Sequence, residues 1–303
     1  MKTILIKKLD EIKKIDDLTL CLGFFDALHE GHLTLIKEAL KIGGKVGVLT
    51  FSKNPRELLL NQSCKIVNTL EMKLEILEQY HVDYFIILDL SWDILNLTKE
   101  QFIDQILLKL GTKRIVCGFD YTYGTKGEGK ANDLVNSNLF VVKIIEEIKN
   151  EKNQKISSTL IHQLIKEGDI ESANRYLTRP YKIVGVVDKG FQIGRVLNFK
   201  TANIKLLDNF ELPSNGVYAT KIYVDGKYYN SMTNVGTHPT INELKFPKIE
   251  TFIFDFDQDI YNLDVKLEFY KKTRNEIKFS SLEKLKEQLV HDEKEIRSFF
   301  KWM

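Results

Sequence analysis

Two histidines, His29 and His32, have the residue type and the spacing that suit chemistry on a phosphate. They follow an apolar run that ends at Gly23, and residues with helical spacing begin at His32. The first turn of a helix offers backbone N–H groups and a positive dipole, and both favour phosphate oxygens. Imidazoles placed there can donate hydrogen bonds to the charge that develops when an α-phosphate is attacked. The pair therefore predicts a phosphate-transfer site, with a surface pair or a metal site as the alternatives.

Thr201 and Asn203 form a second candidate site in the other half of the chain. In an extended segment their side chains lie on the same side, where they present hard oxygen ligands. Mg²⁺ prefers such ligands and completes its shell with waters and substrate phosphates. Gly190 and Gly194 precede them, and glycines let backbone amides approach the phosphates of a nucleotide. Taken alone, so short a pattern is uninformative and a solvent-exposed strand end is the better interpretation; the residues around it favour a functional site.

The first half of the chain alternates short apolar runs with segments of helical spacing, which predicts a parallel sheet with helices on both faces. In such sheets ligands bind at the carboxyl ends of the strands, so we expect the chemistry in the turn after the first strand. An exposed loop is expected over Glu146–Lys155, then a helix near Ser157–Glu167, then a helix from the cap Asp169 to about Leu177. The other expected elements are strands at Leu18–Gly23, Lys45–Phe51, Asp83–Leu88, Arg114–Gly118 and Leu139–Ile145, and helices at His32–Ile42, Leu70–Tyr80 and Lys99–Leu110.

From Tyr181 to about Phe269 the sequence has short strand-like segments separated by turn residues, which predicts an antiparallel barrel. Asp225 and Gly226 form a hairpin signal between two such segments. The C-terminal segment is expected to be a helix, which Ser280 and Glu283 begin as a capping box. The expected strands include Lys182–Val187, Val217–Val224, Lys227–Thr233 and Glu250–Phe256, and the apolar face of the helix would be Leu282, Leu285, Leu289, Ile296 and Phe299.

These patterns predict an α/β domain over residues 1–180 and a β-barrel domain with a C-terminal helix over residues 181–303. The 44 basic and 42 acidic side chains nearly balance, so the charge gives no reason to expect nucleic acid as a partner. No apolar run is long enough for a signal sequence or a membrane span. The three cysteines form no metal or redox pattern, and each lies in or beside an apolar run. We therefore expect a cytoplasmic protein without a membrane partner.

The segment 23–32, GFFDALHEGH, resembles the first signature of the HxGH nucleotidyltransferase superfamily, which in the flavin branch typically has GxFDGxHxGH. Segments 50–57 (TFSKNPRE), 118–124 (GFDYTYG) and 156–162 (ISSTLIH) are similar to the later segments of that branch, TFxPHPRE, GxDFxFG and ISSTxIR. The resemblance implies that His29 and His32 are catalytic. It also implies nucleotide binding by Gly23, Phe25, Asp26, Gly31, Ser157, Ser158, Thr159 and His162, and flavin binding by Asp120, Tyr121 and Tyr123.

The second half resembles riboflavin kinases. Segment 190–204, GFQIGRVLNFKTANI, is similar to their GxxxGRxLGFPTANI motif, and the PxxGVY and NxGxxPT segments follow in order. The resemblance implies nucleotide binding by Gly190, Gly194 and Arg195, and metal binding by Thr201 and Asn203. It makes Glu250 the general base, which would take a proton from the ribityl 5′-hydroxyl as that oxygen attacks the γ-phosphate. Arg274 and Glu276 would border the flavin or pair with each other.

The resemblance covers about residues 18 to 292 and identifies the chain as similar to the bifunctional prokaryotic riboflavin kinase/FAD synthetase family. It implies phosphorylation of riboflavin to FMN and adenylylation of FMN to FAD. ATP would be the co-substrate of both reactions, Mg²⁺ the metal, and FMN and FAD the products. The sequence does not set the oligomeric state.

Several positions depart from the family pattern: Ala27, Lys53, Asn54, His162, Asn198 and Lys200. His162 replaces an arginine that would clamp phosphates, and a neutral imidazole has neither its permanent charge nor its fork of donors. Lys126 or Lys155 would be a compensating cation. The alternatives are an enzyme with one active half, a non-catalytic flavin-binding regulator, and an adenylyltransferase that makes precursors of NAD or coenzyme A.

Overall fold

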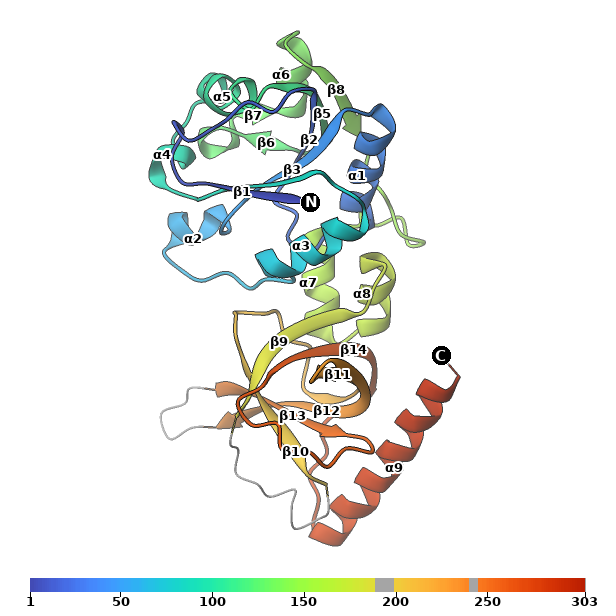
Figure 1. The fold of residues 1–303 in the computed structure, drawn as a ribbon. Helices are drawn as coiled ribbons and strands as arrows, with labels where there is room; N and C mark the ends of the chain where they lie inside the picture. The colour runs from blue at the N-terminus through green and yellow to red at the C-terminus, as the bar shows by residue number, and fades with distance from the viewer. Residues whose placement is uncertain (189–198, 240–244, 303) are drawn as a thin grey trace. The chain divides into compact units, whose positions relative to one another are not determined.

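The computed structural model describes residues 1–188, 199–239 and 245–302, and the chain divides into two compact units, Met1–Ser158 and Thr159–Met303. Each unit has its own architecture (Figure 1). The first is a parallel sheet with helices, and the second is a closed antiparallel barrel that carries two short helices and one long one. The predicted fold class is therefore confirmed.

The first unit is built on a six-stranded sheet in the order β1-β4-β3-β2-β5-β8, in which every pair of neighbours is parallel. Central strand β2 is buried along its whole length, as parallel strands covered on both faces usually are. Its carboxyl end therefore opens directly into the turn that carries the histidines. The strands are β1 Lys2–Ile6, β2 Leu18–Leu22, β3 Lys45–Phe51, β4 Tyr84–Leu88, β5 Thr112–Gly118 and β8 Val141–Ile145.

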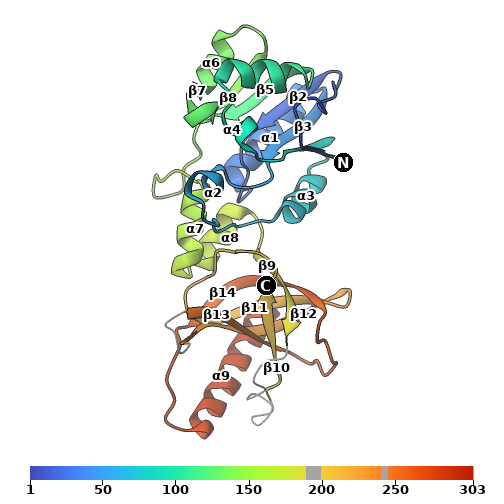
Figure 2. The same ribbon diagram turned by 90° about the vertical axis from the view of Figure 1, so that its left-hand side faces the viewer.

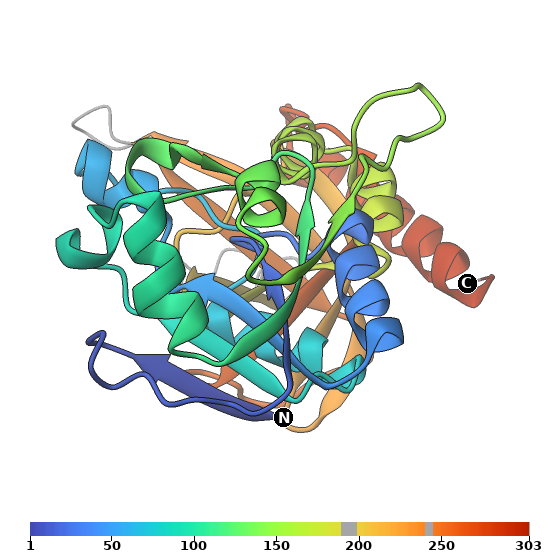
Figure 3. The same ribbon diagram turned by 90° about the horizontal axis from the view of Figure 1, so that it is seen from above.

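Helices cover both faces of this sheet, and each face has its own apolar core. Side chains of α1 and α3 fill one core, and side chains of α4, α5 and α6 fill the other. Figure 3 shows α1 and α5 on opposite sides of the strands. A two-stranded hairpin of β6 and β7 completes the unit. The bounds are α1 Glu30–Ile42, α2 Pro55–Leu60, α3 Leu70–Gln79, α4 Trp92–Leu95, α5 Lys99–Phe102, α6 Ala131–Asn136, β6 Thr122–Tyr123 and β7 Gly129–Lys130.

The expected strands and helices of this half are present, with ends that differ by a few residues. The helix expected at Lys99–Leu110 is divided into α5 and a π-helical segment, Ile103–Leu108. Strand β1 was not expected, because its five residues lie mostly exposed at the edge of the sheet and show no long apolar run. Among the described residues no helix has the length and the apolar character that crossing a membrane requires.

The second unit contains a closed barrel in the order β10-β13-β12-β11-β14-β9, with antiparallel pairing throughout. The hairpin expected at Asp225 and Gly226 joins β11 to β12. Strand β12 is longer than the predicted segment Lys227–Thr233, and β14 continues past Phe269, where the predicted barrel region ends. The bounds are β9 Tyr181–Asp188, β10 Thr201–Leu206, β11 Gly216–Val224, β12 Lys227–Pro239, β13 Lys245–Ile253 and β14 Asp264–Arg274.

Helix α9, Leu282–Lys301, packs on the outside of the barrel (Figure 2). Ile296 is buried there among side chains of β11 and β12, and Leu289 and Phe299 pack against the same cluster. The predicted cap was wrong by one residue, because Ser281 is the N-cap and its hydroxyl accepts a hydrogen bond from the backbone N–H of Lys284. Leu282 does not belong to the buried face, since it is 53% exposed in the first turn.

Helices α7, Ser158–Glu167, and α8, Ile170–Leu177, lead into the barrel. The side chain of Asp169 caps α8 as predicted, by accepting a hydrogen bond from the backbone N–H of Ser172. Helix α8 contacts β9 and β14, and Asn174 donates a hydrogen bond to the carbonyl of Phe269. The compact unit consequently begins at Thr159, before the predicted domain boundary at residue 180. That boundary stays a prediction about where the two activities divide.

Candidate active sites

The turn between β2 and α1 carries the predicted histidine pair. His29 is the N-cap of α1, and both Phe25 and Leu28 have positive φ, at 53° and 46°. Such left-handed backbone costs a bulky residue about 1–2 kcal/mol. Gly23 suits the close packing of this turn, because a Cβ there would lie 3.0 Å from the ring of Phe25. The turn is strained, so its shape depends on the elements that hold it.

The rings of His29 and His32 stack with centroids 3.8 Å apart and an interplanar angle of 21°. His29 is buried, and the ring of Phe25 meets the ring of His32 at 5.1 Å in an edge contact. Gly31 leaves room for this arrangement, since a Cβ on it would lie 3.0 Å from Cε1 of His29. The structure therefore brings the two imidazoles together at the N-terminus of α1, as expected. Their catalytic role stays a prediction.

Asp26 is a buried member of the same turn. Its carboxylate accepts a hydrogen bond from the backbone N–H of Val67 at 3.3 Å, and its carbonyl accepts one from the side chain of Asn68 at 2.7 Å. These contacts show that Asp26 orders the turn, in addition to the nucleotide contact predicted for it.

The second signature begins beside the histidine turn. The carbonyl of Ile156 lies 3.8 Å from the position that a Cβ on Gly31 would take. Ser157 follows, and Ser158 is the first residue of α7. Thr159 and His162 belong to the second compact unit. There Nδ1 of His162 lies 3.1 Å from Oε2 of Glu211, so this imidazole is engaged with a carboxylate of its own unit.

The predicted flavin turn contains Asp120, Tyr121 and Tyr123. The two tyrosine rings lie parallel with centroids 6.0 Å apart, and Tyr123 is buried against Phe102 in the apolar core. Burial raises the pKa of Tyr123 to about 12 and also raises that of Tyr121. Tyr121 is partly buried beside the same core, and Phe119 is exposed at this turn. Flavin binding by Asp120, Tyr121 and Tyr123 stays a prediction.

Lys155, one of the two suggested compensating cations, lies at this flavin turn. Its ammonium pairs with the carboxylate of Asp120 and lies 4.6 Å from the ring centroid of Phe119. The other suggested cation, Lys126, is exposed and has a positive φ of 52°.

The barrel unit contains a cavity of about 540 Å³ that gathers three of the four predicted kinase residues lying in the described part of the chain. Thr201, Glu250 and Arg274 line it, together with Glu276 and Asn234. Its apolar wall includes Phe199, Val217, Met232, Phe252, Leu285 and Leu289, so strands and the first half of α9 form one site. The mixture of an apolar wall and a few convergent polar groups is typical of a small-molecule site.

Glu250 faces this cavity because of its place in β13. Its neighbour Thr251 points the other way, into a buried chain of hydroxyls that includes Thr233 and Thr220. In the backbone pairing of the strands, Glu250 lies opposite Asn203 of β10 and opposite Asn234 of β12. Asn203 alternates with Ala202, so it lies on the same side of β10 as Thr201. These neutral oxygens beside a carboxylate fit the donor set that Mg²⁺ prefers.

Arg274 does not pair with Glu276. Its Nε and Nη2 donate hydrogen bonds to the carboxylate of Asp292 in α9 at 2.6–3.0 Å, whereas Glu276 accepts one from the side chain of Asn215 at 3.0 Å. Asp292 is buried and was not predicted as a site residue.

Lys248 was also not predicted as a site residue, although its alternation with Glu250 along β13 was visible in the sequence. Gly190, Gly194 and Arg195 lie outside the described residues.

Comparison with known proteins matches both halves of the chain. The family model described as FAD synthetase matches residues 11–160, and the model described as riboflavin kinase matches residues 177–300. The bifunctional riboflavin kinase/FMN adenylyltransferase of Listeria monocytogenes is 37% identical over 289 residues, which are 93% of this chain and 92% of that protein. The chain belongs to this family. The Bacillus subtilis member is 34% identical and is also covered to 92%.

One solved structure is similar over the full length. It is described as a macrolide-efflux protein from Streptococcus pneumoniae, is 32% identical, and superposes with a TM-score of 0.91 over 97% of this chain and 98% of its own. That description concerns the other protein. The likeness shows that both units have the folds found in that structure.

Two departures from the family pattern now have structural explanations. Asn54, where the family has histidine, is the N-cap of α2, and its side chain accepts a hydrogen bond from the backbone N–H of Arg56 at 3.0 Å. Lys200, where the family has proline, pairs with Asp257. Both contacts are local and lie on exposed surface.

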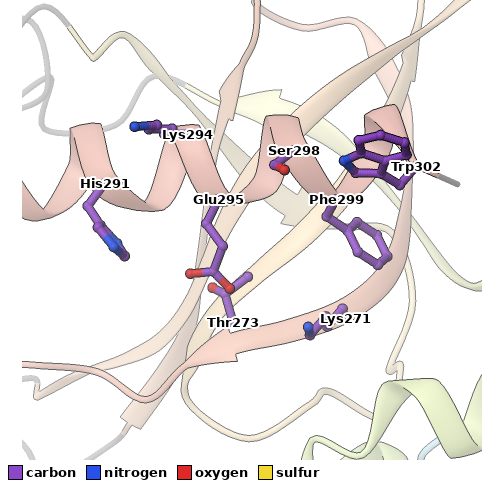
Figure 4. A pocket seen from close by; sticks show the side chains of 8 residues that line it. All are labelled: Lys271, Thr273, His291, Lys294, Glu295, Ser298, Phe299 and Trp302. Atoms are coloured by element: carbon purple, nitrogen blue, oxygen red, sulfur yellow. The ribbon is translucent and has the colours of Figure 1, made fainter.

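A larger hollow of about 820 Å³ lies between β14 and α9 (Figure 4). Lys271, Thr273, Glu295 and Phe299 are among its lining residues, and the side chain of Glu295 points toward Thr273. The hydroxyl of Thr273 donates its hydrogen bond to the carbonyl of Val217. None of the predicted site residues lines this hollow. Thr201, Glu250 and Arg274 line the smaller cavity instead.

Proposed function

We propose that the chain catalyses two successive ATP-dependent reactions, phosphorylation of riboflavin to FMN and adenylylation of FMN to FAD. Membership of the riboflavin kinase/FMN adenylyltransferase family supports both. The observation that carries the proposal is that one chain holds a stacked histidine pair at a helix N-terminus and, in its other unit, a carboxylate-bearing cavity with an apolar wall.

In the kinase half, Glu250 accepts the proton of the ribityl 5′-hydroxyl. That oxygen forms a bond to the γ-phosphorus, and the bond from the γ-phosphorus to the bridging oxygen breaks, so that ADP leaves. The apolar wall of the cavity, with Phe252 and Leu289, would hold the flavin ring. Thr201 and Asn203 would hold Mg²⁺, which would neutralise charge on the phosphates.

In the adenylyl half, a phosphate oxygen of FMN attacks the α-phosphorus of ATP, and pyrophosphate leaves. His29 and His32 would donate hydrogen bonds to the oxygens on which charge develops. The N-terminus of α1 adds its dipole and its backbone N–H groups. Ser157 and Ser158, at the start of α7, would bind the phosphates that leave.

An enzyme with a single activity is the second candidate. The pairing of His162 with Glu211 favours it, because this imidazole takes the place of the phosphate-clamping arginine. In that case the kinase half would be the active one.

The predicted cytoplasmic location is part of the proposal. Cys21 and Cys117 are buried thiols, and burial raises the pKa of Cys117 to about 12 and that of Cys21 further. Thiols held in the protonated form beside apolar side chains are structural and need no disulfide partner, which fits a reducing compartment.

The test is to incubate the purified protein with riboflavin, ATP and Mg²⁺ and to separate the flavins by chromatography. We expect FMN first and FAD later, and neither product when EDTA replaces Mg²⁺. FMN alone would establish the single-activity candidate. Absence of both products would contradict the proposal and favour a non-catalytic flavin-binding protein.

A further inference from the structure

Lys73 is a buried lysine that is not among the residues predicted for either site. It lies in α3 and is only 3% exposed, although lysine is among the residues least often buried. Its helix is amphipathic, and the neighbouring buried positions Met72, Ile76 and Leu77 are apolar. An apolar residue would fill this position without the penalty of burying a charge.

The ammonium of Lys73 reaches the histidine turn. Its Nζ donates a hydrogen bond to the carbonyl of Phe24 at 3.2 Å and lies 4.3 Å from the centroid of the Phe24 ring. The same carbonyl accepts a second hydrogen bond, from the hydroxyl of Thr50 at 2.7 Å. The negative charge of Asp26 also acts on Lys73, partly offsetting the burial that lowers its pKa to about 8.

The carbonyl of Phe24 belongs to the peptide that enters the strained residue Phe25. The left-handed φ of Phe25 directs its ring to the edge contact with His32, and His32 stacks on His29. A contact chain thus runs from Lys73 through Phe24 and Phe25 to the imidazole pair. Strained backbone persists where the surroundings hold it in place, and here two donors from different elements hold one carbonyl.

We propose that Lys73 is a positioning residue of the adenylyl-transfer site, because it fixes the peptide of Phe24 and thereby the contact of Phe25 with His32. This inference rests on the proposed function of the histidine pair. Lys73 acts on the imidazoles through the turn. A purely structural role for Lys73 would leave the imidazoles undisturbed when its charge and its donor are removed.

The test compares Lys73→Met with Lys73→Arg in the full chain. We expect Lys73→Met to lower kcat for the conversion of FMN to FAD by about 10- to 100-fold, with KM for FMN and ATP changed by less than about threefold, because misplaced catalytic groups lower turnover. Lys73→Arg keeps a cationic donor and should recover most of the rate. The riboflavin kinase rate of the same preparations is the internal control and should not change.

A second readout is spectroscopic. The imidazole Cε1–H resonances of His29 and His32, assigned with His29→Gln and His32→Gln, should move in Lys73→Met because their ring contacts change. Lys37→Met is the matched control, since Lys37 lies 6.0 Å from the centroid of the Tyr80 ring but is exposed on α1. That control should move neither the two resonances nor the adenylylation rate.

Unchanged adenylylation in Lys73→Met, or unmoved imidazole resonances, would overturn the inference. If Lys73→Met does not fold, Thr50→Val removes the other hydrogen bond to the Phe24 carbonyl, and the same two readouts decide in the same way. The His29→Gln variant separates this inference from the proposed function. If His29→Gln still makes FAD, the histidine site itself is wrong. If His29→Gln is inactive and Lys73→Met is normal, only the role of Lys73 fails.

Discussion

In the barrel cavity, Nζ of Lys248 lies 2.7 Å from Oε1 of Glu250. The two residues alternate along β13 and so share a face, and both side chains are 25% exposed. The predicted general base is thus held in place by a cation that lines the same cavity. This ion pair limits the directions in which the carboxylate can point.

Glu250→Gln should abolish the kinase step. A glutamine of equal size cannot accept the hydroxyl proton, and loss of a general base typically lowers the rate about 10²- to 10⁴-fold. Conversion of supplied FMN to FAD should continue, because that reaction belongs to the histidine site. Glu295→Gln, in the larger hollow beside α9, is the matched control and should leave both rates unchanged. A kinase rate in Glu250→Gln equal to that of the parent would remove Glu250 from the mechanism.

Lys248→Met should slow phosphorylation of riboflavin without abolishing it. A partly exposed ion pair is worth up to about 1 kcal/mol, which corresponds to roughly fivefold in rate if all of it orients the carboxylate. Lys248→Arg keeps the positive charge, so its phosphorylation rate should fall less than that of Lys248→Met. The measurement is kcat for FMN formation in both variants at saturating substrates. A larger loss in Lys248→Met than in Glu250→Gln would mean that Lys248 acts on the phosphates directly.

The fold was largely predictable, because strands such as β2 and β3 are continuous apolar runs and α1 has clear helical spacing. Strand β1 was not predicted, because its apolar run is only three residues long and the strand lies mostly exposed at the edge of the sheet. The cap of α9 was ambiguous because Ser280 and Ser281 are adjacent and only the local backbone decides between them.

The candidate sites were predictable where motifs mark them and not where distant contacts form them. His29, Thr201 and Glu250 lie in continuous motifs. Asp292 lies in a charged helix segment, and only the docking of α9 brings it to Arg274. Helical spacing places Lys73 on the same face of α3 as Ile76 and Leu77, but a lysine is among the residue types least expected on a buried face. Only the packing of α3 against the turn shows which groups its ammonium contacts.

Asp292→Ala should destabilise the barrel unit strongly. Arg274 is mostly buried, and removing its carboxylate partner leaves a buried charge without compensation, which costs about 3–5 kcal/mol. Asp255→Ala is the matched control, because Asp255 makes a similar two-point contact with Arg297 but is 79% exposed. Asp255→Ala should lower the free energy of unfolding by less than about 1 kcal/mol. Urea unfolding of both variants measures the difference, and equal losses would contradict a buried role for Asp292.

His162→Ala should lower adenylylation only modestly. Because Nδ1 of His162 lies against Glu211, the ring can offer a phosphate at most one nitrogen, whereas an arginine offers a fork of donors. We expect a loss of about tenfold or less, mainly in KM for ATP, compared with 10²- to 10³-fold for a full transition-state contact. The measurement is steady-state kinetics of FAD formation, with KM for ATP and kcat determined for the parent chain and for His162→Ala. A loss beyond 10²-fold would mean that His162 replaces the arginine completely.

Because of Lys73, the free energy of unfolding should change with pH in the alkaline range. Burial lowers its pKa from 10.5 to about 8 in the folded chain. Below pH 8 the folded and the unfolded chain both carry the proton, and the folded chain bears the full penalty of a buried charge. Between about pH 8 and 10.5 only the unfolded chain still holds the proton, so the free energy of unfolding rises with pH.

The gain should reach about 3 kcal/mol near pH 10.5, on the order of 1.4 kcal/mol for each pKa unit. Other groups titrate in the same range, so the quantity to measure is the difference in unfolding free energy between the parent chain and Lys73→Met at several pH values. The variant lacks the ammonium and should be the more stable of the two at pH 7. This advantage should shrink as the pH rises through 8 and be largely lost near 10.5. A difference that stays constant with pH would show that Lys73 keeps an ordinary lysine pKa, and its burial would then cost the fold nothing.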